Sequence, residues 1–146
     1  MDIKFFYKNN QHSYKHEAII TSFANAIAQV LPLPATLEVC LYDLGKNVYG
    51  GVDRYHINRL GINYDLDFQS IPKILTHELI HVNQKHMKIL EVRQNDVYYW
   101  HGVPYTKVLP HEMSYEDYQN LPWELDVQLR QSKVLLAAMA VLSTNS

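Results

Sequence analysis

The chain has 146 residues, of which 47% are hydrophobic and 19% charged, a globular composition that excludes a disordered protein. The formal net charge of −2 gives no electrostatic reason to expect nucleic-acid binding. The single cysteine, Cys40, excludes an intrachain disulfide. The first residues do not resemble a signal peptide, and the longest apolar run, residues 134–142, is too short to span a membrane. We therefore expect a cytoplasmic protein with no membrane partner, folded as one domain over residues 1–146.

The first half of the chain predicts a helix and a small sheet. Residues 3–7 have the apolar character of a short strand, and residues 14–30 carry apolar side chains at helical spacing. Pro32 and Pro34 would end that helix. Three further segments have the alternation or β-branching of strands: residues 36–41, 48–53 and 55–63. This order predicts the α+β class, with an N-terminal helix followed by a small mixed sheet.

A second helix is predicted over residues 71–88. Ser70 is a suitable N-cap, and Pro72 falls in the first turn. The apolar stripe of this helix comprises Ile71, Ile74, Leu75, Leu79 and Val82.

Within this helix, residues 77–81 read His-Glu-Leu-Ile-His. His77 and His81 are four residues apart, so they lie on one face and can bind the same metal ion. Glu78 can then act as general base for a water that the metal activates. A random chain of this composition would contain the pattern about 2% of the time. The alternative interpretation is a pair of surface histidines on an amphipathic helix.

This pentapeptide resembles the HExxH motif of the zincin metallopeptidases, and the likeness extends loosely over residues 70–142. The metzincin branch has Gly and His where this chain has Gln84 and Met87. The resemblance therefore implies the gluzincin-like arrangement, in which a carboxylate from a later helix is the third ligand. It also implies a small zincin-like domain that binds one Zn²⁺ per chain and hydrolyses an amide bond in a peptide or protein. The same ligand types also suit iron(II) or manganese.

Two acidic residues on a later predicted helix, residues 121–142, compete for the third ligand position. Pro122 suits the first helical position and Asn120 could cap the helix. The family pattern favours Asp126 slightly, because gluzincin-like ligands are often Glu followed by a small residue, and the residue after Asp126 is Val127. The helical wheel favours Glu124, which lies on the uncharged side where a carboxylate needs a partner.

Asp126, by contrast, is four residues before Arg130 and can form an ordinary ion pair with it. We favour Glu124 and keep Asp126 as the alternative ligand. If Glu124 binds no metal, its alternative role is that of a capping carboxylate at the helix N-terminus.

Between the two helices, residues 89–93 and 97–100 predict a β-hairpin that forms a wall over the cleft or only covers the core. The hairpin and the Leu-Pro-Trp-Glu sequence of residues 121–124 resemble small predicted metallopeptidases of bacteria and phages. Candidate donors for a developing oxyanion also lie in this region, with His101 and Tyr105 preferred. The full set of candidates is Tyr98, His101, Tyr105, His111 and Tyr115.

Three functional hypotheses follow. The first is a zinc metallopeptidase with Glu78 as general base. The second is a non-catalytic, metal-containing module that binds a peptide or protein. The third is a structural zinc protein, which could assemble through residues 134–142. The sequence identifies neither the substrate nor the oligomeric state.

Overall fold

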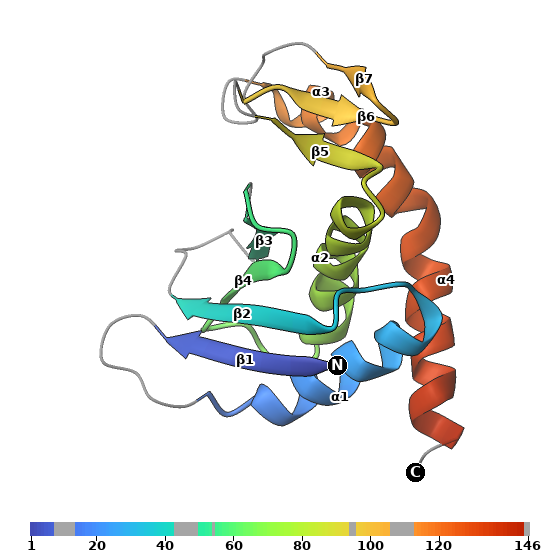
Figure 1. Cartoon of the computed structure of the whole chain (residues 1–146). Helices are drawn as coiled ribbons and strands as arrows, with labels where there is room; N and C mark the ends of the chain where they lie inside the picture. Colours follow the sequence, from blue (N-terminus) through green and yellow to red (C-terminus); the bar gives the residue numbers. More distant parts are fainter. Residues whose placement is uncertain (8–13, 43–49, 54, 94–95, 106–112, 145–146) are drawn as a thin grey trace.

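A computed structural model describes residues 1–7, 14–42, 50–53, 55–93, 96–105 and 113–144. The chain has an α+β fold with a four-stranded sheet, a three-stranded sheet and four helices among these residues (Figure 1). The elements are, in order, β1 (Asp2–Tyr7), α1 (Glu17–Val30), β2 (Thr36–Tyr42), β3 (Gly50–Val52), β4 (Arg59–Asn63), α2 (Ile71–His86), β5 (Leu90–Val92), β6 (Tyr98–Trp100), β7 (Val103–Pro104), α3 (Tyr115–Gln119) and α4 (Pro122–Thr144). Among the described helices, none has the length and apolar character needed to cross a membrane.

The larger sheet has the strand order β1-β2-β4-β3. The first three strands of this order run parallel, and the edge strand β3 pairs antiparallel with β4. Alternate residues of β2, together with β4, supply the buried face: Leu37, Val39, Leu41, Leu60 and Ile62. The mixed sheet predicted from the sequence is therefore confirmed.

Two of the strands predicted for the larger sheet are shorter in the structure. Of the segment 48–53, the strand covers Gly50–Val52, and residues 48 and 49 lie outside the described part. The segment 55–63 was predicted as one strand, but only Arg59–Asn63 is. The preceding residues form a turn because the Asp53 carboxylate accepts hydrogen bonds from the backbone N–H groups of Tyr55 and His56.

The helix predictions are confirmed with small shifts. Helix α1 begins at Glu17, three residues later than predicted, and ends before Leu31, whose backbone is extended. Helix α2 begins at Ile71 as predicted, but the side chain of Ser70 does not cap it. In the turn before this helix, the Asp67 carboxylate accepts hydrogen bonds from the backbone N–H groups of Gln69 and Ser70.

The hairpin of β5 and β6 is confirmed, and β7 adds a third antiparallel strand that the sequence did not predict. The sequence also missed the short helix α3, whose N-terminus is capped by the side chain of Ser114. Asn120 was predicted to cap α4, but it is the C-terminal cap of α3. Helix α4 itself runs from Pro122 to Thr144, close to the predicted range.

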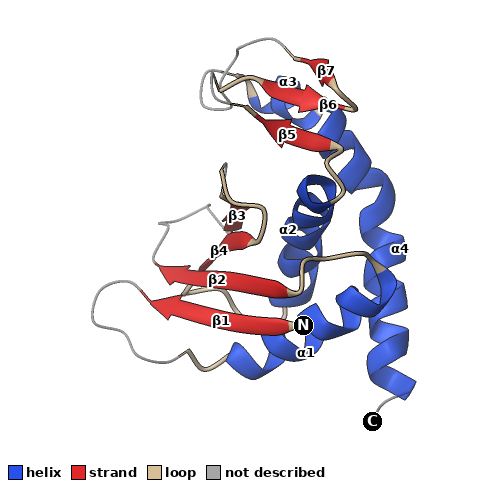
Figure 2. Ribbon diagram, viewed as in Figure 1, coloured by secondary structure: helices blue, strands red, loops and turns tan. Residues whose placement is uncertain are grey.

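The buried side chains form two clusters. The main core lies between the larger sheet and helices α1, α2 and α4, and includes Ile27, Leu60 and Leu79. The small core lies under the hairpin. Its buried residues are Leu90, Leu121 and Trp123, and Tyr98, Trp100, Met113 and Tyr118 pack against them. Figure 2 shows the two sheets at separate ends of the molecule, with α2 between them and α4 running past both.

Candidate metal site

Three potential metal ligands meet where α2 passes the first turn of α4. They are His77, His81 and Glu124, and their ligand atoms all lie within 4.8 Å of one another. Nε2 of His81 is 3.1 Å from Oε1 of Glu124, and Nε2 of His77 is 3.5 Å from Oε2 of the same carboxylate. The packing of α2 against α4 therefore brings together two histidines one turn apart and an acid from 43 positions further along.

Charge and burial at this group favour a cation. The Glu124 side chain is 6% exposed and that of His81 is 10% exposed. Burial alone would raise the pKa of Glu124, but hydrogen bonds from His77, His81 and Tyr118 hold it well below its usual range. Burial opposes protonation of His81, yet the hydrogen bond to Glu124 raises the pKa of this histidine overall. A buried carboxylate that stays ionised is a suitable partner for a metal ion.

Glu78 lies beside this group. Its residue is 7% exposed, and burial raises the pKa of its carboxyl against the opposing effect of His81 and His77. Glu78 lines the same hollow as the three potential ligands, which has a volume of about 390 Å³. A carboxyl with a raised pKa at such a position is suited to taking up and returning a proton.

The orientation of His81 is fixed from behind by Gln84. Nδ1 of His81 is 2.8 Å from the side-chain oxygen of Gln84, which can only accept, so Nδ1 carries a proton. Nε2 is then the nitrogen that faces Glu124. The Gln84 amide nitrogen donates to the backbone oxygen of Trp123 and to the Asp126 carboxylate, both at 2.9 Å.

Asp126 is held away from the potential ligands. Its carboxylate forms the predicted ion pair with Arg130, with an N–O distance of 2.7 Å, and also accepts from Gln84. Arg130 in turn donates to Asn83. The structure therefore brings Glu124, and not Asp126, to the two histidines. Asp126 supports Gln84 from behind.

The candidate donors for an oxyanion are mostly outside the hollow. Tyr98 lines it, whereas the preferred candidates do not appear in its lining: His101 is exposed against Trp100, and Tyr105 packs on the edge of Trp123. Tyr115 is 76% exposed. His111 lies outside the described residues.

The residue that sequence reasoning missed is Tyr118. Its hydroxyl donates a hydrogen bond to Glu124, and the residue lines the hollow beside Tyr98. Burial, followed by the charge of Glu124, raises the pKa of Tyr118, so the hydroxyl keeps its proton. With eleven tyrosines in the chain and α3 unpredicted, no signal in the sequence distinguished this one.

The wall opposite α2 depends on Gly50 in β3. A Cβ atom at this position would lie 2.9 Å from the backbone oxygen of Gly61 and 3.5 Å from Cγ of Glu78. At Gly51 the same addition meets nothing within 4 Å. Gly50 is therefore the residue that lets the edge strand approach Glu78 closely.

Comparisons of the chain with protein-family models, with curated proteins and with solved structures found no match in any of the three. The residues and geometry described above therefore carry the functional argument.

Proposed function

We propose that this protein is a gluzincin-like zinc metallopeptidase that hydrolyses a peptide bond. The observation that carries the proposal is the convergence of His77, His81 and Glu124 to within 4.8 Å, beside a buried Glu78 and an open hollow. Chance would supply the pentapeptide rarely, and its proximity to an acid from a distant helix is a second, separate observation. We propose peptides or proteins as the substrate class.

The donor set fits zinc. Two imidazole nitrogens and one carboxylate are the protein ligands of a common type of catalytic zinc site. Ligand atoms at about 2.0–2.1 Å from one tetrahedral ion lie roughly 3.3 Å from each other. Each histidine has one Glu124 oxygen near that separation, Oε1 at 3.1 Å from His81 and Oε2 at 3.5 Å from His77. When bound, zinc would supply Lewis-acid chemistry that acidifies a water molecule and polarises a carbonyl group.

The chain's own residues would do the proton chemistry. Glu78 would take a proton from the attacking water and return it to the leaving nitrogen, which its raised pKa favours. Gln84 would keep His81 in the orientation needed for binding the metal. We assign donation to the developing oxyanion to Tyr98, which lines the hollow, in place of His101 and Tyr105, because the single O–H of Tyr118 donates to Glu124.

The test is a substrate search with zinc-loaded wild-type protein, in which a peptide mixture is incubated and new termini are identified by mass spectrometry. For any peptide that is cleaved, we expect Glu78→Gln to retain zinc and the folded state but to lose about 10²- to 10⁴-fold in turnover. Glu116→Gln, which changes an exposed carboxylate on α3, is the matched control and should leave turnover unchanged.

Hydrolysis by Glu78→Gln at the wild-type rate would contradict the proposal. Zinc-dependent binding of peptides without cleavage would instead favour the non-catalytic binding module.

A further inference from the structure

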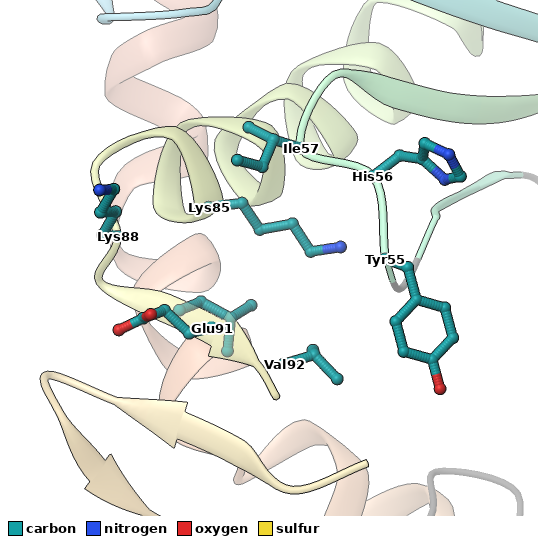
Figure 3. Close-up of a pocket in the computed structure, with 8 residues that line it drawn as sticks. Tyr55, His56, Ile57, Lys85, Lys88, Glu91 and Val92 are labelled. Atoms are coloured by element: carbon teal, nitrogen blue, oxygen red, sulfur yellow. The ribbon is translucent and has the colours of Figure 1, made fainter. Parts of the chain in front are cut away.

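A second hollow continues the cleft beyond the candidate metal site. It has a volume of about 210 Å³ and lies between the loop after β3, the last turns of α2 and strand β5 (Figure 3). Lys85 and Leu90 line both this hollow and the one that contains Glu78. A peptide held at the candidate metal site could therefore extend a side chain or its end into the second hollow.

Lys85 is the charged group at the junction. It follows His81 by four residues on α2, which is about 6 Å along the helix axis. The residue is only 9% exposed, and its ammonium donates to the backbone oxygen of Asp53, which fixes its position. Figure 3 shows the Lys85 side chain reaching into the hollow toward Tyr55 and His56.

Two other charged residues, Lys88 and Glu91, also line the hollow. In Figure 3 their head groups point away from the Lys85 ammonium. The Glu91 carboxylate is 3.8 Å from Arg93. Ile57, Leu90 and Val92 supply the apolar part of the lining, and Tyr55 and His56 supply polar groups.

This combination has a defined chemical preference. Apolar walls accept the methylene groups of a ligand, and an ammonium at the inner end binds a carboxylate through charge-assisted hydrogen bonds. The ammonium already donates to the Asp53 carbonyl, and a ligand carboxylate would bind it beside that carbonyl. We propose that this hollow is a subsite for a carboxylate of the peptide substrate, either an acidic side chain or the C-terminus, with Lys85 as the specificity-determining residue. The inference rests on the proposed function for the identity of the ligand as a peptide.

The test uses the zinc-loaded Glu78→Gln protein, so that bound peptides are not consumed. Two randomised synthetic heptapeptide libraries, one with a free and one with an amidated C-terminus, are selected for binding and sequenced by mass spectrometry. An acidic side chain in the subsite predicts enrichment of Asp or Glu at one fixed position in both libraries, by about tenfold. Binding of the C-terminus predicts that the free library alone is retained.

Substitutions in the hollow test whether Lys85 causes the carboxylate preference. Lys85→Met should abolish the preference in either case, and Lys73→Met, which removes an exposed charge of α2 outside both hollows, should preserve it. Because Lys85 is buried and its replacement can impair folding, Ile57→Glu is the second variant. Ile57 is 47% exposed, so a carboxylate there is compatible with the fold and should repel an acidic ligand.

The subsite proposal is overturned if no peptide binds, if neither a carboxylate preference nor a free-terminus preference is found, or if the preference persists in both Lys85→Met and Ile57→Glu. Its failure is separable from failure of the proposed function. Carboxylate-dependent binding that wild-type protein never converts to cleavage would refute the peptidase and keep the subsite. Glu78-dependent cleavage with no carboxylate preference would keep the peptidase and refute the subsite.

Discussion

The main core and the small core are built differently, and the candidate metal site lies where they meet. The main core contains many fully buried aliphatic side chains from the sheet and three helices. The small core has three buried residues, and most of the side chains around them are aromatic. Trp123 stacks on Tyr98 with ring centroids 5.2 Å apart, directly before Glu124 in the sequence. We infer that the main core supplies most of the stability, and that the small core sets the position of Glu124 relative to the two histidines.

The largest expected effect on stability comes from the main core. Leu60 is fully buried in β4, so Leu60→Ala should lower the free energy of unfolding by about 2–5 kcal/mol. The variant should still bind zinc at low temperature, because Leu60 is not in the lining of the site. Trp123→Leu should do the reverse, lowering zinc affinity more than stability.

Chemical denaturation and zinc titration of both variants would measure this contrast. Equal losses of stability and zinc affinity in the two variants would refute the division of roles between the cores.

A smaller effect is expected from Gln84, which connects the two cores through Trp123 and Asp126. Gln84→Leu removes the acceptor for His81 and leaves buried polar groups without their partner. We expect zinc affinity to fall about 10- to 100-fold and stability to fall by about 1–3 kcal/mol. Gln128→Leu, at an exposed position of α4, is the matched control in competition titrations with a metal-binding dye. Unchanged affinity in Gln84→Leu would mean that the orientation of His81 does not depend on this amide.

The edge strand provides a pair of neighbouring glycines for comparison. Gly50→Ala places a methyl group 2.9 Å from the Gly61 oxygen, so β3 must shift, at a cost of about 1–3 kcal/mol. Gly51→Ala meets no atom within 4 Å and should change stability by less than about 1 kcal/mol. Thermal denaturation of the two variants measures the difference. Equal melting temperatures would show that β3 moves freely relative to Glu78.

The pH dependence of zinc binding follows from the ion pair of His81 and Glu124. Zinc binds the neutral imidazole, and the carboxylate raises the pKa of His81, so protons compete with the metal up to a higher pH than for a free histidine. Zinc affinity should therefore rise with pH, by up to about tenfold per unit, and level off above the pKa of His81. Titrations in a series of buffers would test this, and an affinity that falls with rising pH over that range would contradict it.

Much of the fold was predictable because its helices and the strands of the larger sheet have regular apolar spacing. The apolar stripe from Ile71 to Val82 predicted the position of α2 to within a few residues. The two prolines after α1 predicted where that helix ends. The shorter β4, by contrast, depends on the Asp53 side chain, whose hydrogen bonds compete locally with strand pairing. Helix α3 has five residues and none of them is buried, so it has no apolar stripe to recognise.

Some residues of the candidate site were likewise predictable from the sequence, and others were not. The two histidines are four residues apart, so helical geometry alone predicted that they are neighbours. The helical wheel also favoured Glu124 over Asp126. It placed Glu124 on the uncharged side of the helix and Asp126 within ion-pair distance of Arg130. Tyr118 was not predictable, because its contact with Glu124 requires the turn between α3 and α4. The role of Gln84 likewise requires the packing of α2 against α4.

The most direct test of the central claim is the metal content of untagged protein, measured by mass spectrometry after zinc is supplied and excess removed. Wild-type protein should carry about one zinc per chain. His77→Ala and Glu124→Gln should lose it, while Asp126→Asn should retain it. Zinc retained by Glu124→Gln and lost from Asp126→Asn would contradict the assignment of the third ligand. A wild-type chain without stoichiometric metal would contradict the peptidase proposal as a whole.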